Sequence, residues 1–575
     1  MKAVDGEFAI SGTFPTIQDI IDFKEGTANF QYGYYRFIPH PYLKTAQSSL
    51  REHFGARYVV LYNSLQTGLA ELLRYLDRAP RTESVHIYYE QNISALPAIE
   101  DITGSETFNS IEVSIFSIDE FTGQDAFDRT RWAIIAVEQF GNYDTVLEQS
   151  DYVPSRRDNI AVLAAKPSND PIDVKKAKLW LTPLNKPDSP IRGAAIFGNA
   201  ERQLMELGQR TKRRGYYLSS RNARALLDGE SVTESVNVVE SVKNRIAELE
   251  DGTDTFLFPS GMNAIQTVLD ILRTPEKQHV ISIGHLYRDT FTTLKNAPIV
   301  NAGPENTFLG VDEIETLERH VTPSTACIIT ESITNPLNDV PDLELIQSVA
   351  RKHDIPVVVD NTIATPYNCK PFDFGADFVI HSTTKFLNGK NNHAGGAVIV
   401  REGKYTQALN AYQHRWDNSL SPLEVEVLQQ NIRDFPERME RFNANAWRLV
   451  ELLQSQLQVK EVFYNGLESH RTYDAARRIL SDSSSVVSFT LQKDSLEGLR
   501  AFYDQDFAHI DKAPTLGSDH TLICLYTLLT HYEEPEEYLK EVNLPRYLIR
   551  IAVGSEKDFQ PVLDSVQSAF DNLPD

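Results

Sequence analysis

Two ionisable side chains lie just beyond predicted buried strands, where they could act on one ligand. Asp360 ends the apolar run in "IPVVVDN", and Lys385 follows the run in "DFVIHSTTK" after a short turn. In parallel α/β sheets, ligands bind outside the carboxyl ends of the strands. A lysine whose pKa is depressed by its pocket can act as a nucleophile and carry protons. The sequence therefore predicts one pocket that an acid and a lysine share.

Two further motifs could complete such a pocket. "LFPSGMNAI" places a small-residue turn, with Gly261 and Met262, directly before a predicted helix. The free backbone N–H groups and the dipole at the start of a helix favour a phosphate. "HLYRDT" places Tyr287 just after another predicted strand. These motifs predict a phosphate site with a tyrosine available at the same edge of the sheet.

The elements that must position these residues alternate between strand and helix. From 254 to about 400, apolar runs of four to six residues suggest strands buried on both faces, and amphipathic stretches such as "PDLELIQSVARKHD" separate them. This order indicates an α/β domain with a mostly parallel sheet. Residues 421–457 are expected to form one long helical stretch, broken or kinked at Pro436. The strands "SSVVSFTL" and "YLIRIAV" then predict a smaller terminal α/β domain.

Residues 1–205 repeat the same order of predicted elements. Matching positions are separated by 193 to 203 residues, a slow drift that duplication with small insertions would produce. The matched pairs are Glu138 and Glu331, Asn142 and Asn335, Ala165 and Asp360, Asn92 and Tyr287, Ser64 and Gly261, and Thr182 and Lys385. In this alignment the first copy has lost the lysine, the acid and the glycine turn.

Composition limits the classes of partner. The chain has 575 residues, a formal net charge of −24 and a pI near 5.1. Nucleic acids and anionic membranes select positive surfaces, so neither is an expected partner. The start of the chain has no apolar signal region, and no run of about 18 apolar residues occurs. The three cysteines do not have the spacing of metal ligands. We expect them to be buried, reduced residues of the apolar core. We expect a cytoplasmic protein with no metal site.

Five motifs in order resemble the cysteine/methionine-metabolism enzymes that use pyridoxal phosphate (PLP), such as cystathionine γ-synthase and cystathionine γ-lyase. They are "PSGMNA", "HLYRDT", "ITNPL", "VVVDNTIATP" and "HSTTKFLNG". The later segments "FYNGLESH" and "LIRIAVGSEKDF" resemble the family's terminal domain. The resemblance covers about 210–575. The chain length, with "GYYRFIPHP" and "RDFPERMERFNANA", looks most like the long fungal-type cystathionine γ-synthase-like form.

The resemblance implies a fold-type-I PLP-dependent transferase and a role for each matched residue. Lys385 would bind the cofactor covalently and then move protons, while Asp360 would keep the pyridine nitrogen protonated. Tyr287 would stack on the ring and Asn335 would contact its far side. Arg550 would clamp the substrate α-carboxylate. The phosphate would be held by backbone or hydroxyl groups of Gly261, Met262, Ser382 and Thr384.

Two departures from the family pattern border the expected substrate. The family's Gly-His after the lysine is Gly389-Lys390 here. The family's Ser-Leu-Gly-Gly loop is "TLGS", with Thr515 in place of serine and Pro514 where an acid is common. The cofactor is therefore implied more directly than the substrate, although Thr515 is still expected beside the substrate carboxylate.

One element shows the opposite pattern of loss. In the family, a Tyr-x-Arg from one subunit reaches the cofactor phosphate of the other. The first copy keeps this as Tyr34-Tyr35-Arg36, whereas the second has Ser219 before Arg221. We expect the two copies to pair as an internal pseudo-dimer, in which Tyr34 and Arg36 complete the site that has the lysine. Whole chains could also pair, so Arg36 could act within one chain or between two.

The expected domains are a degenerate PLP-fold large domain (1–205), a catalytic PLP-binding large domain (206–435) and a small C-terminal domain (436–575). The favoured reaction is γ-replacement, in which cysteine displaces the acyl group of an O-acylhomoserine to give cystathionine. The alternatives are a γ- or β-lyase acting on cystathionine or methionine, and a catalytically silent PLP-fold binding protein. Retention of Asp360, Lys385 and Arg550 argues against the silent protein.

Overall fold

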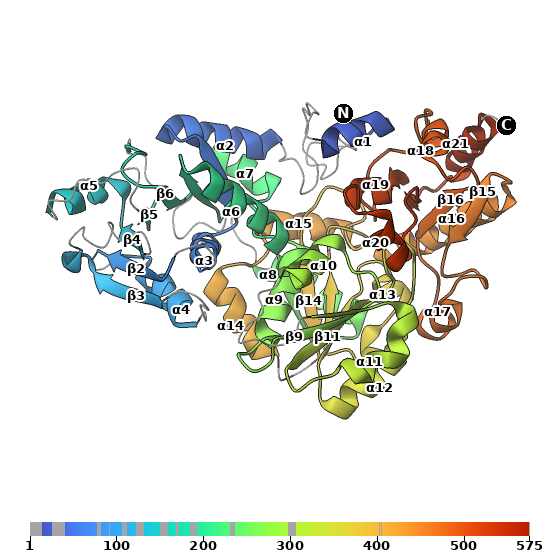
Figure 1. Cartoon of the computed structure of the whole chain (residues 1–575), viewed down its shortest axis with the longest axis horizontal. Helices are drawn as coiled ribbons and strands as arrows, with labels where there is room; N and C mark the ends of the chain where they lie inside the picture. Colours follow the sequence, from blue (N-terminus) through green and yellow to red (C-terminus); the bar gives the residue numbers. More distant parts are fainter. Residues whose placement is uncertain are drawn as a thin grey trace. The chain divides into compact units, whose positions relative to one another are not determined.

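The computed structural model describes residues 14–25, 41–77, 82–90, 93–105, 112–121, 131–149, 159–167, 172–184, 192–230, 236–296, 306–401, 403 and 405–573. These residues form two compact units (Figure 1). Unit 1 contains 1–40, 237–406 and 424–575, and unit 2 contains 41–236 and 407–423. The boundaries expected at 205/206 and 435/436 stay predictions.

The larger sheet of unit 1 has seven described strands in the order β10-β9-β11-β12-β13-β14-β8. The first five are parallel, whereas β14 is antiparallel to both of its neighbours. The strands are β8 (Asp254–Phe258), β9 (His279–Ile283), β10 (Thr307–Leu309), β11 (Thr325–Glu331), β12 (Val357–Asp360), β13 (Phe378–His381) and β14 (Gly396–Val400). Strands β9, β11, β13 and β14 are buried along their whole length, as their near-continuous apolar runs predict. The predicted mostly parallel α/β sheet is confirmed.

Helices connect and cover this sheet. They are α8 (Val236–Glu250), α9 (Gly261–Leu272), α10 (Arg288–Lys295), α11 (Leu317–His320), α12 (Leu343–His353), α13 (Thr365–Asn368) and α15 (Pro422–Asn431), with the 3₁₀ helices η3 (Val311–Thr316) and η4 (Pro371–Phe374). In Figure 1, α11 and α12 lie side by side below the sheet. The long helix predicted over 421–457 is wrong in one respect: α15 ends at Asn431, and α16 (Phe435–Ser455) starts before Pro436. Proline sits in the first turn of α16, where its missing N–H has no helical partner to lose.

The smaller sheet of unit 1 has four described antiparallel strands in the order β15-β16-β18-β17. They are β15 (Val459–Phe463), β16 (Val486–Leu491), β17 (Leu522–Leu525) and β18 (Ile549–Ala552). The accompanying helices are α16, α17 (Tyr473–Ile479), α18 (Leu496–Tyr503), α19 (Tyr526–Thr530), α20 (Glu536–Glu541) and α21 (Gln560–Asp571). The predicted strands in "SSVVSFTL" and "YLIRIAV" are thereby confirmed.

An N-terminal helix, α1 (Ile17–Lys24), belongs to this part of unit 1. Phe14, Ile17 and Ile20 are fully buried in the same apolar core as α16, β16 and α21. The Ile17 amide also donates to Asp504 at 2.8 Å, and the Tyr503 hydroxyl donates to the Phe14 carbonyl at 2.9 Å. Burial of three large apolar side chains anchors α1 beside the smaller sheet.

Unit 2 contains a second seven-stranded sheet, in the order β1-β7-β6-β5-β4-β2-β3 among the described strands. The strands are β1 (Tyr58–Tyr62), β2 (Ser84–Tyr89), β3 (Glu112–Ser117), β4 (Arg131–Val137), β5 (Ile160–Ala164), β6 (Leu179–Pro183) and β7 (Ala194–Gly198). The helices are α2 (Pro41–Phe54), α3 (Leu65–Leu76), α4 (Leu96–Ser105), α5 (Phe140–Gln149), α6 (Glu201–Arg214), α7 (Ser220–Asp228) and α14 (Thr406–Trp416), with the 3₁₀ helix η1 (Ile118–Glu120).

The two large sheets have the same topology. Numbered along each unit, the order is 1-7-6-5-4-2-3 in both, and the seventh strand is antiparallel to both of its neighbours in both. The helix after the first strand also starts in the same way, because Ser64 caps α3 as Ser260 caps α9. Because the topology is shared, individual residues of one sheet can be matched with residues of the other.

The register corrects the pairs that the sequence alignment gave. We aligned β1 with β8 and then followed the residue pairing outwards, through β7 to β6 in unit 2 and through β14 to β13 in unit 1. Thr182 then corresponds to His381, not to Lys385. The pairing also matches Leu163, not Ala165, with Asp360. Likewise Ser64 matches Ser260, so that Leu65 stands where Gly261 does. The corrected positions are still without the acid and the glycine, since Leu163 is a buried apolar residue.

A buried ion cluster joins two helices of unit 2. Glu71 on α3 is fully buried and accepts from Arg74 at 3.1 Å, Arg210 at 3.1 Å and Arg214 at 3.2 Å. Burial raises the pKa of Glu71, but the three arginines overcome this effect and lower it to about 2. The carboxylate therefore remains charged and holds α3 against α6.

Two sequence expectations concern the chain as a whole. All three cysteines are buried and free, as predicted. Among the described residues, no helix is both long enough and apolar enough to cross a membrane.

Candidate active site

The start of α9 and the turn after β13 form a tight cradle. Ser260 caps α9 by accepting from the Asn263 amide at 3.1 Å, so the helix begins at Gly261. A Cβ atom on Gly261 would lie 2.8 Å from the Cβ atom of Ser382, so only glycine fits here. The Ser382 hydroxyl is buried and has no hydrogen-bond partner among the described residues. A free hydroxyl beside the amides of a helix start fits an anion such as a phosphate.

Asp360 ends β12 next to this cradle. Its Oδ1 atom accepts from the Thr362 amide at 3.0 Å and from the Thr362 hydroxyl at 2.5 Å. The same hydroxyl oxygen accepts from the Ser382 amide at 2.8 Å. Burial raises the pKa of Asp360, whereas the bonds from Thr362 and the charge of His381 lower it. Thr362 therefore fixes both the acid and the serine turn.

A second acid, Glu331, lies beside Asp360. It ends β11, pairs with Asp360 across the parallel strands and accepts from the Tyr287 amide. Burial and then the charge of Asp360 raise the pKa of Glu331 well above its usual value. Two neighbouring carboxyl groups, one buried and one partly buried, favour a bound positive charge, such as a protonated ring nitrogen.

Lys385 is partly buried and contacts a loop that is distant in sequence. Its Nζ atom donates to Oγ1 of Thr515 at 2.8 Å. The loop approaches closely at Gly517, where a Cβ atom would lie 2.6 Å from the Phe386 amide nitrogen. The φ angle of Gly517 is +73°, which also favours glycine. The "TLG" segment is thus held directly against the lysine.

Arg550 lies in β18, between two paired strands, and is 2% exposed. Its Nη1 atom donates to Asn335 Oδ1 at 3.1 Å, and Nη2 donates to the carbonyls of Pro514 and Thr515 at 2.6 and 3.0 Å. Its Nε atom has no hydrogen-bond partner among the described residues. The guanidinium lies 5.3 Å from the centre of the Tyr526 ring. A fixed guanidinium with a free donor can bind a carboxylate.

The structure therefore places most of the predicted residues in two groups, and contacts join the members within each group. One contains Gly261, Ser382 and Asp360, with Tyr287 joined through Glu331. The other contains Lys385, Thr515, Arg550 and Asn335.

Four predicted residues need separate comment. The Thr384 hydroxyl already donates to the Gly395 carbonyl at 3.2 Å and accepts from the Gly395 amide at 3.0 Å. The Met262 side chain is buried, and its sulfur lies 3.5 Å from the Thr290 hydroxyl, so only its backbone can face a ligand. Tyr34 and Arg36 lie outside the described residues. The roles of all four stay predictions.

Sequence reasoning missed several groups that shape the site. Glu331 ends an apolar strand as Asp360 does, and that position was a usable signal. Thr362 and Tyr526 had no comparable signal. A buried relay also lies behind the lysine turn: His393 bonds Glu424 through Nδ1 and Thr383 through Nε2, both at 3.0 Å.

Comparison with known proteins agrees with this geometry. The family described as Cys/Met metabolism PLP-dependent enzyme matches residues 234–571. The chain belongs to this family. Cystathionine gamma-lyase of Bacillus subtilis is 30% identical over 328 residues, which are 57% of this chain and 85% of the relative. L-methionine gamma-lyase of Pseudomonas putida is 32% identical over 337 residues, 58% of this chain and 83% of the relative.

Solved structures give the same result. Cystathionine gamma synthase of Xanthomonas oryzae pv. oryzae, in complex with cystathionine, has a TM-score of 0.54 and 26% identity. The match covers 59% of this chain and 86% of that one. Cystathionine gamma-lyase of Lactobacillus plantarum, complexed with L-serine, also has a TM-score of 0.54, with 28% identity over 58% of this chain and 86% of that one. The protein is a PLP-dependent enzyme of cysteine and methionine metabolism with the fold-type-I architecture, and the predicted cofactor is confirmed.

Proposed function

We propose that the two residue groups hold PLP and an amino-acid substrate in one site. The amides of Gly261 and Met262 and the hydroxyl of Ser382 would bind the cofactor phosphate. Asp360 would face the ring nitrogen, and Glu331 would lie beside it and hold the Tyr287 amide. The unpartnered Ser382 hydroxyl supports the first assignment, and the paired carboxyl groups support the second. When bound, PLP supplies an electron sink for carbanion chemistry.

The proposed reaction is γ-replacement of an O-acylhomoserine by cysteine. Arg550 would orient the substrate by its α-carboxylate, with its unpaired Nε atom as an available donor. Lys385 would move protons at Cα and Cβ. The observation that carries this proposal is the link through Thr515, whose hydroxyl accepts from Lys385 while its carbonyl accepts from Arg550. The proton carrier and the carboxylate clamp are thereby held at one fixed separation, as chemistry at Cα requires.

A lyase is the second candidate, because relatives reported above carry the names cystathionine gamma-lyase and L-methionine gamma-lyase. The long form with two large sheets, and the likeness to a cystathionine gamma synthase structure, support the synthase. A silent binding protein is the least supported candidate, since the lysine, the acid and the arginine are all retained, and Lys385 and Arg550 both contact Thr515.

We also infer that unit 2 is a degenerate copy of the large domain. Its support is the shared order and direction of seven strands, which chance rarely reproduces. Ser219, which stands where the family has a tyrosine, caps α7 by accepting from the Asn222 amide at 3.1 Å. Tyr34 and Arg36 would then serve the site that has the lysine. Arg36→Ala should weaken PLP binding about 10- to 150-fold, whereas Arg221→Ala should have a much smaller effect.

The function is tested with purified protein and PLP. O-acetyl-, O-succinyl- and O-phosphohomoserine are each supplied with and without cysteine, and cystathionine and methionine are supplied alone. Cystathionine formation that depends on cysteine supports the synthase, whereas release of thiol or ammonia from cystathionine or methionine alone supports the lyase. Lys385→Ala should abolish turnover and the visible absorbance of the lysine-bound cofactor. A Thr182→Ala control should preserve both.

Mixing chains distinguishes action within one chain from action between chains. A Lys385→Ala chain and an Arg36→Ala chain are combined and assayed. Recovered activity would mean that Arg36 acts on a second chain, and absence of recovery supports action within one chain.

A further inference from the structure

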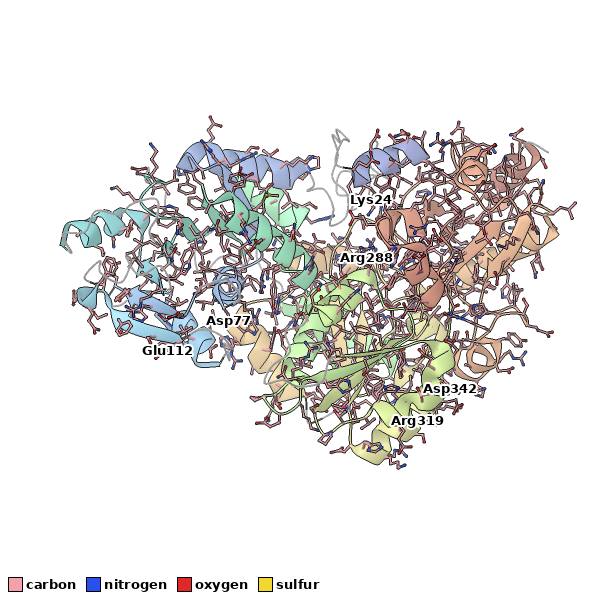
Figure 2. All side chains as sticks on the ribbon, in the orientation of Figure 1. Lys24, Asp77, Glu112, Arg288, Arg319 and Asp342 are labelled. Atoms are coloured by element: carbon pink, nitrogen blue, oxygen red, sulfur yellow. The ribbon has the colours of Figure 1, made fainter. Side chains whose placement is uncertain are left out.

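Basic side chains from three elements of unit 1 lie close enough to interact electrostatically. Lys24 ends α1, Arg288 begins α10, and His531 follows α19. Figure 2 labels Lys24 on α1 and Arg288 at the start of α10. All three side chains are partly buried, so the charges of Lys24 and Arg288 are poorly shielded by water.

The charge on Lys24 is poorly compensated. Burial and then the charge of Arg288 lower the pKa of Lys24, the charge of Glu533 raises it, and the net pKa is about 8. Among the described residues, Lys24 makes no ion pair. Burying a lysine without a partner costs free energy, which a bound anion would offset.

The charge around His531 has the same sign. Burial, and then the neighbouring basic groups Arg288, His285, Lys24 and Arg546, lower the pKa of His531 to about 3. His531 is therefore neutral at physiological pH, and the surrounding field is positive.

Arg288 has an unused donor. Its Nη1 atom is buried and has no hydrogen-bond partner among the described residues. Arg546, also close to His531, is different: it donates to Glu536 at 2.7 Å and to the His531 carbonyl at 3.2 Å. The structure thus satisfies one of these arginines internally and leaves a donor of the other available for a ligand.

This basic group adjoins the proposed substrate site. Tyr526 connects the two, because its ring lies 5.3 Å from the Arg550 guanidinium and 6.2 Å from the His531 ring. Burial raises the pKa of Tyr526, while the charges of Arg550 and, more weakly, Arg288 lower it. Arg288 also directly follows Tyr287, whose amide bonds Glu331. A substrate held by Arg550 could therefore extend towards Arg288.

We propose that Lys24 and Arg288 bind an anionic leaving group on the γ-oxygen of the substrate. This inference rests on the proposed γ-replacement. It assigns the substrate to the anionic esters, O-phosphohomoserine or O-succinylhomoserine, in preference to the neutral acetyl ester. In the reaction the Cγ–O bond breaks and its electron pair leaves with phosphate or succinate. The cysteine sulfur forms the new Cγ–S bond, and its proton passes to the departing anion or to solvent.

The experiment measures steady-state kinetics of the PLP-loaded enzyme with all three esters and cysteine. We expect higher kcat/KM for one or both anionic esters than for the acetyl ester. Arg288→Ala and Lys24→Gln should each raise KM for the preferred anionic ester about 10- to 150-fold and change KM for the acetyl ester less than about threefold. Arg319→Ala, an exposed arginine on α11 that Figure 2 also labels, is the matched control and should change neither.

Calorimetric titration of the loaded enzyme with inorganic phosphate and with succinate separates the two sources of negative charge. Binding of one probe that Arg288→Ala removes supports the site, even if no ester reacts and the proposed function fails. Equal KM values in Arg288→Ala and wild type, with binding of both probes unchanged, would overturn the inference and leave γ-replacement standing. A rise in KM for cysteine alone would also overturn it, since the anion bound there would then be the cysteine carboxylate.

Discussion

Replacing Thr515 with valine tests the link between the lysine and the carboxylate clamp. Valine has nearly the same shape but removes the hydroxyl that accepts from Lys385 at 2.8 Å. The backbone carbonyl remains, so Arg550 keeps its 3.0 Å bond. A hydrogen bond to a charged group contributes about 1.5–3 kcal/mol, and each 1.4 kcal/mol is tenfold. We expect kcat to fall about 10- to 150-fold, with KM for the amino-acid substrate nearly unchanged.

The assay compares Thr515→Val with Thr515→Ser, which restores the hydroxyl. Each purified variant is first checked for cofactor retention by its visible absorbance, and kcat and KM are then measured at saturating cysteine. The serine variant should recover most of the wild-type kcat. The reasoning is refuted if Thr515→Val keeps the wild-type kcat, or if both variants lose activity equally, because the hydroxyl would then have no role in placing Lys385.

Three further outcomes are expected. Asp360→Asn should still bind PLP but lose at least about 10²-fold in kcat, measured with the loaded variant, because the charge that holds the ring nitrogen protonated is gone; a wild-type rate would contradict this role. Gly261→Ala should weaken PLP binding at least about tenfold in a fluorescence titration, because the new methyl group would lie 2.8 Å from the Ser382 Cβ atom. The pKa of Glu71 is about 2 in the folded chain against an ordinary 4.5, so its stabilisation is fully present above about pH 5 and is lost as the pH falls towards 2. Urea unfolding should show a loss of about 3 kcal/mol over this range, at 1.36 kcal/mol per pKa unit, and Glu71→Gln should remove this dependence.

Much of the fold could be predicted because the strands of a parallel sheet are buried on both faces. Runs such as those of β9, β11 and β14 are apolar over their whole length and are bounded by turns. The first polar residue after such a run marks the end of the strand, and ligands bind there. Asp360 and Lys385 were identified as candidates on this basis, and the structure places Asp360 at the end of β12 and Lys385 four residues beyond the end of β13.

Burial of the strands on both faces also explains why the residue-by-residue correspondence between the two large sheets could not be predicted. An exposed strand alternates between apolar and polar residues, and a shift of one residue is then visible in the sequence. A strand buried on both faces has no such alternation, and a shift of two residues keeps each side chain on the same face, so Ala165 and Leu163 were equally acceptable partners for Asp360. Only the strand pairing selects Leu163.

Contacts across long sequence separations were also beyond prediction. The bond from Lys385 to Thr515 spans 130 residues, and that from Arg550 to Asn335 spans 215. Arg288 had no signal at all, since an arginine at the start of a helix is ordinarily a solvated charge. Arg288 becomes a candidate ligand-binding residue only because Lys24 and His531, on other elements, lie near it.

The comparison of the two sheets bears on our proposal that unit 2 is a degenerate copy of the large domain. Strand order and direction depend on the apolar side chains within each strand, and both sheets retain these. The proposed chemistry depends on residues at the strand ends, such as Asp360 and Glu331, which contribute little to the apolar core. Changing them to apolar residues, as Leu163 and Ala136 at the matched positions suggest, removes carboxyl groups that are costly without a cationic ligand. Loss of the site would thus have stabilised the first sheet, which gives a physical reason for its persistence without a lysine.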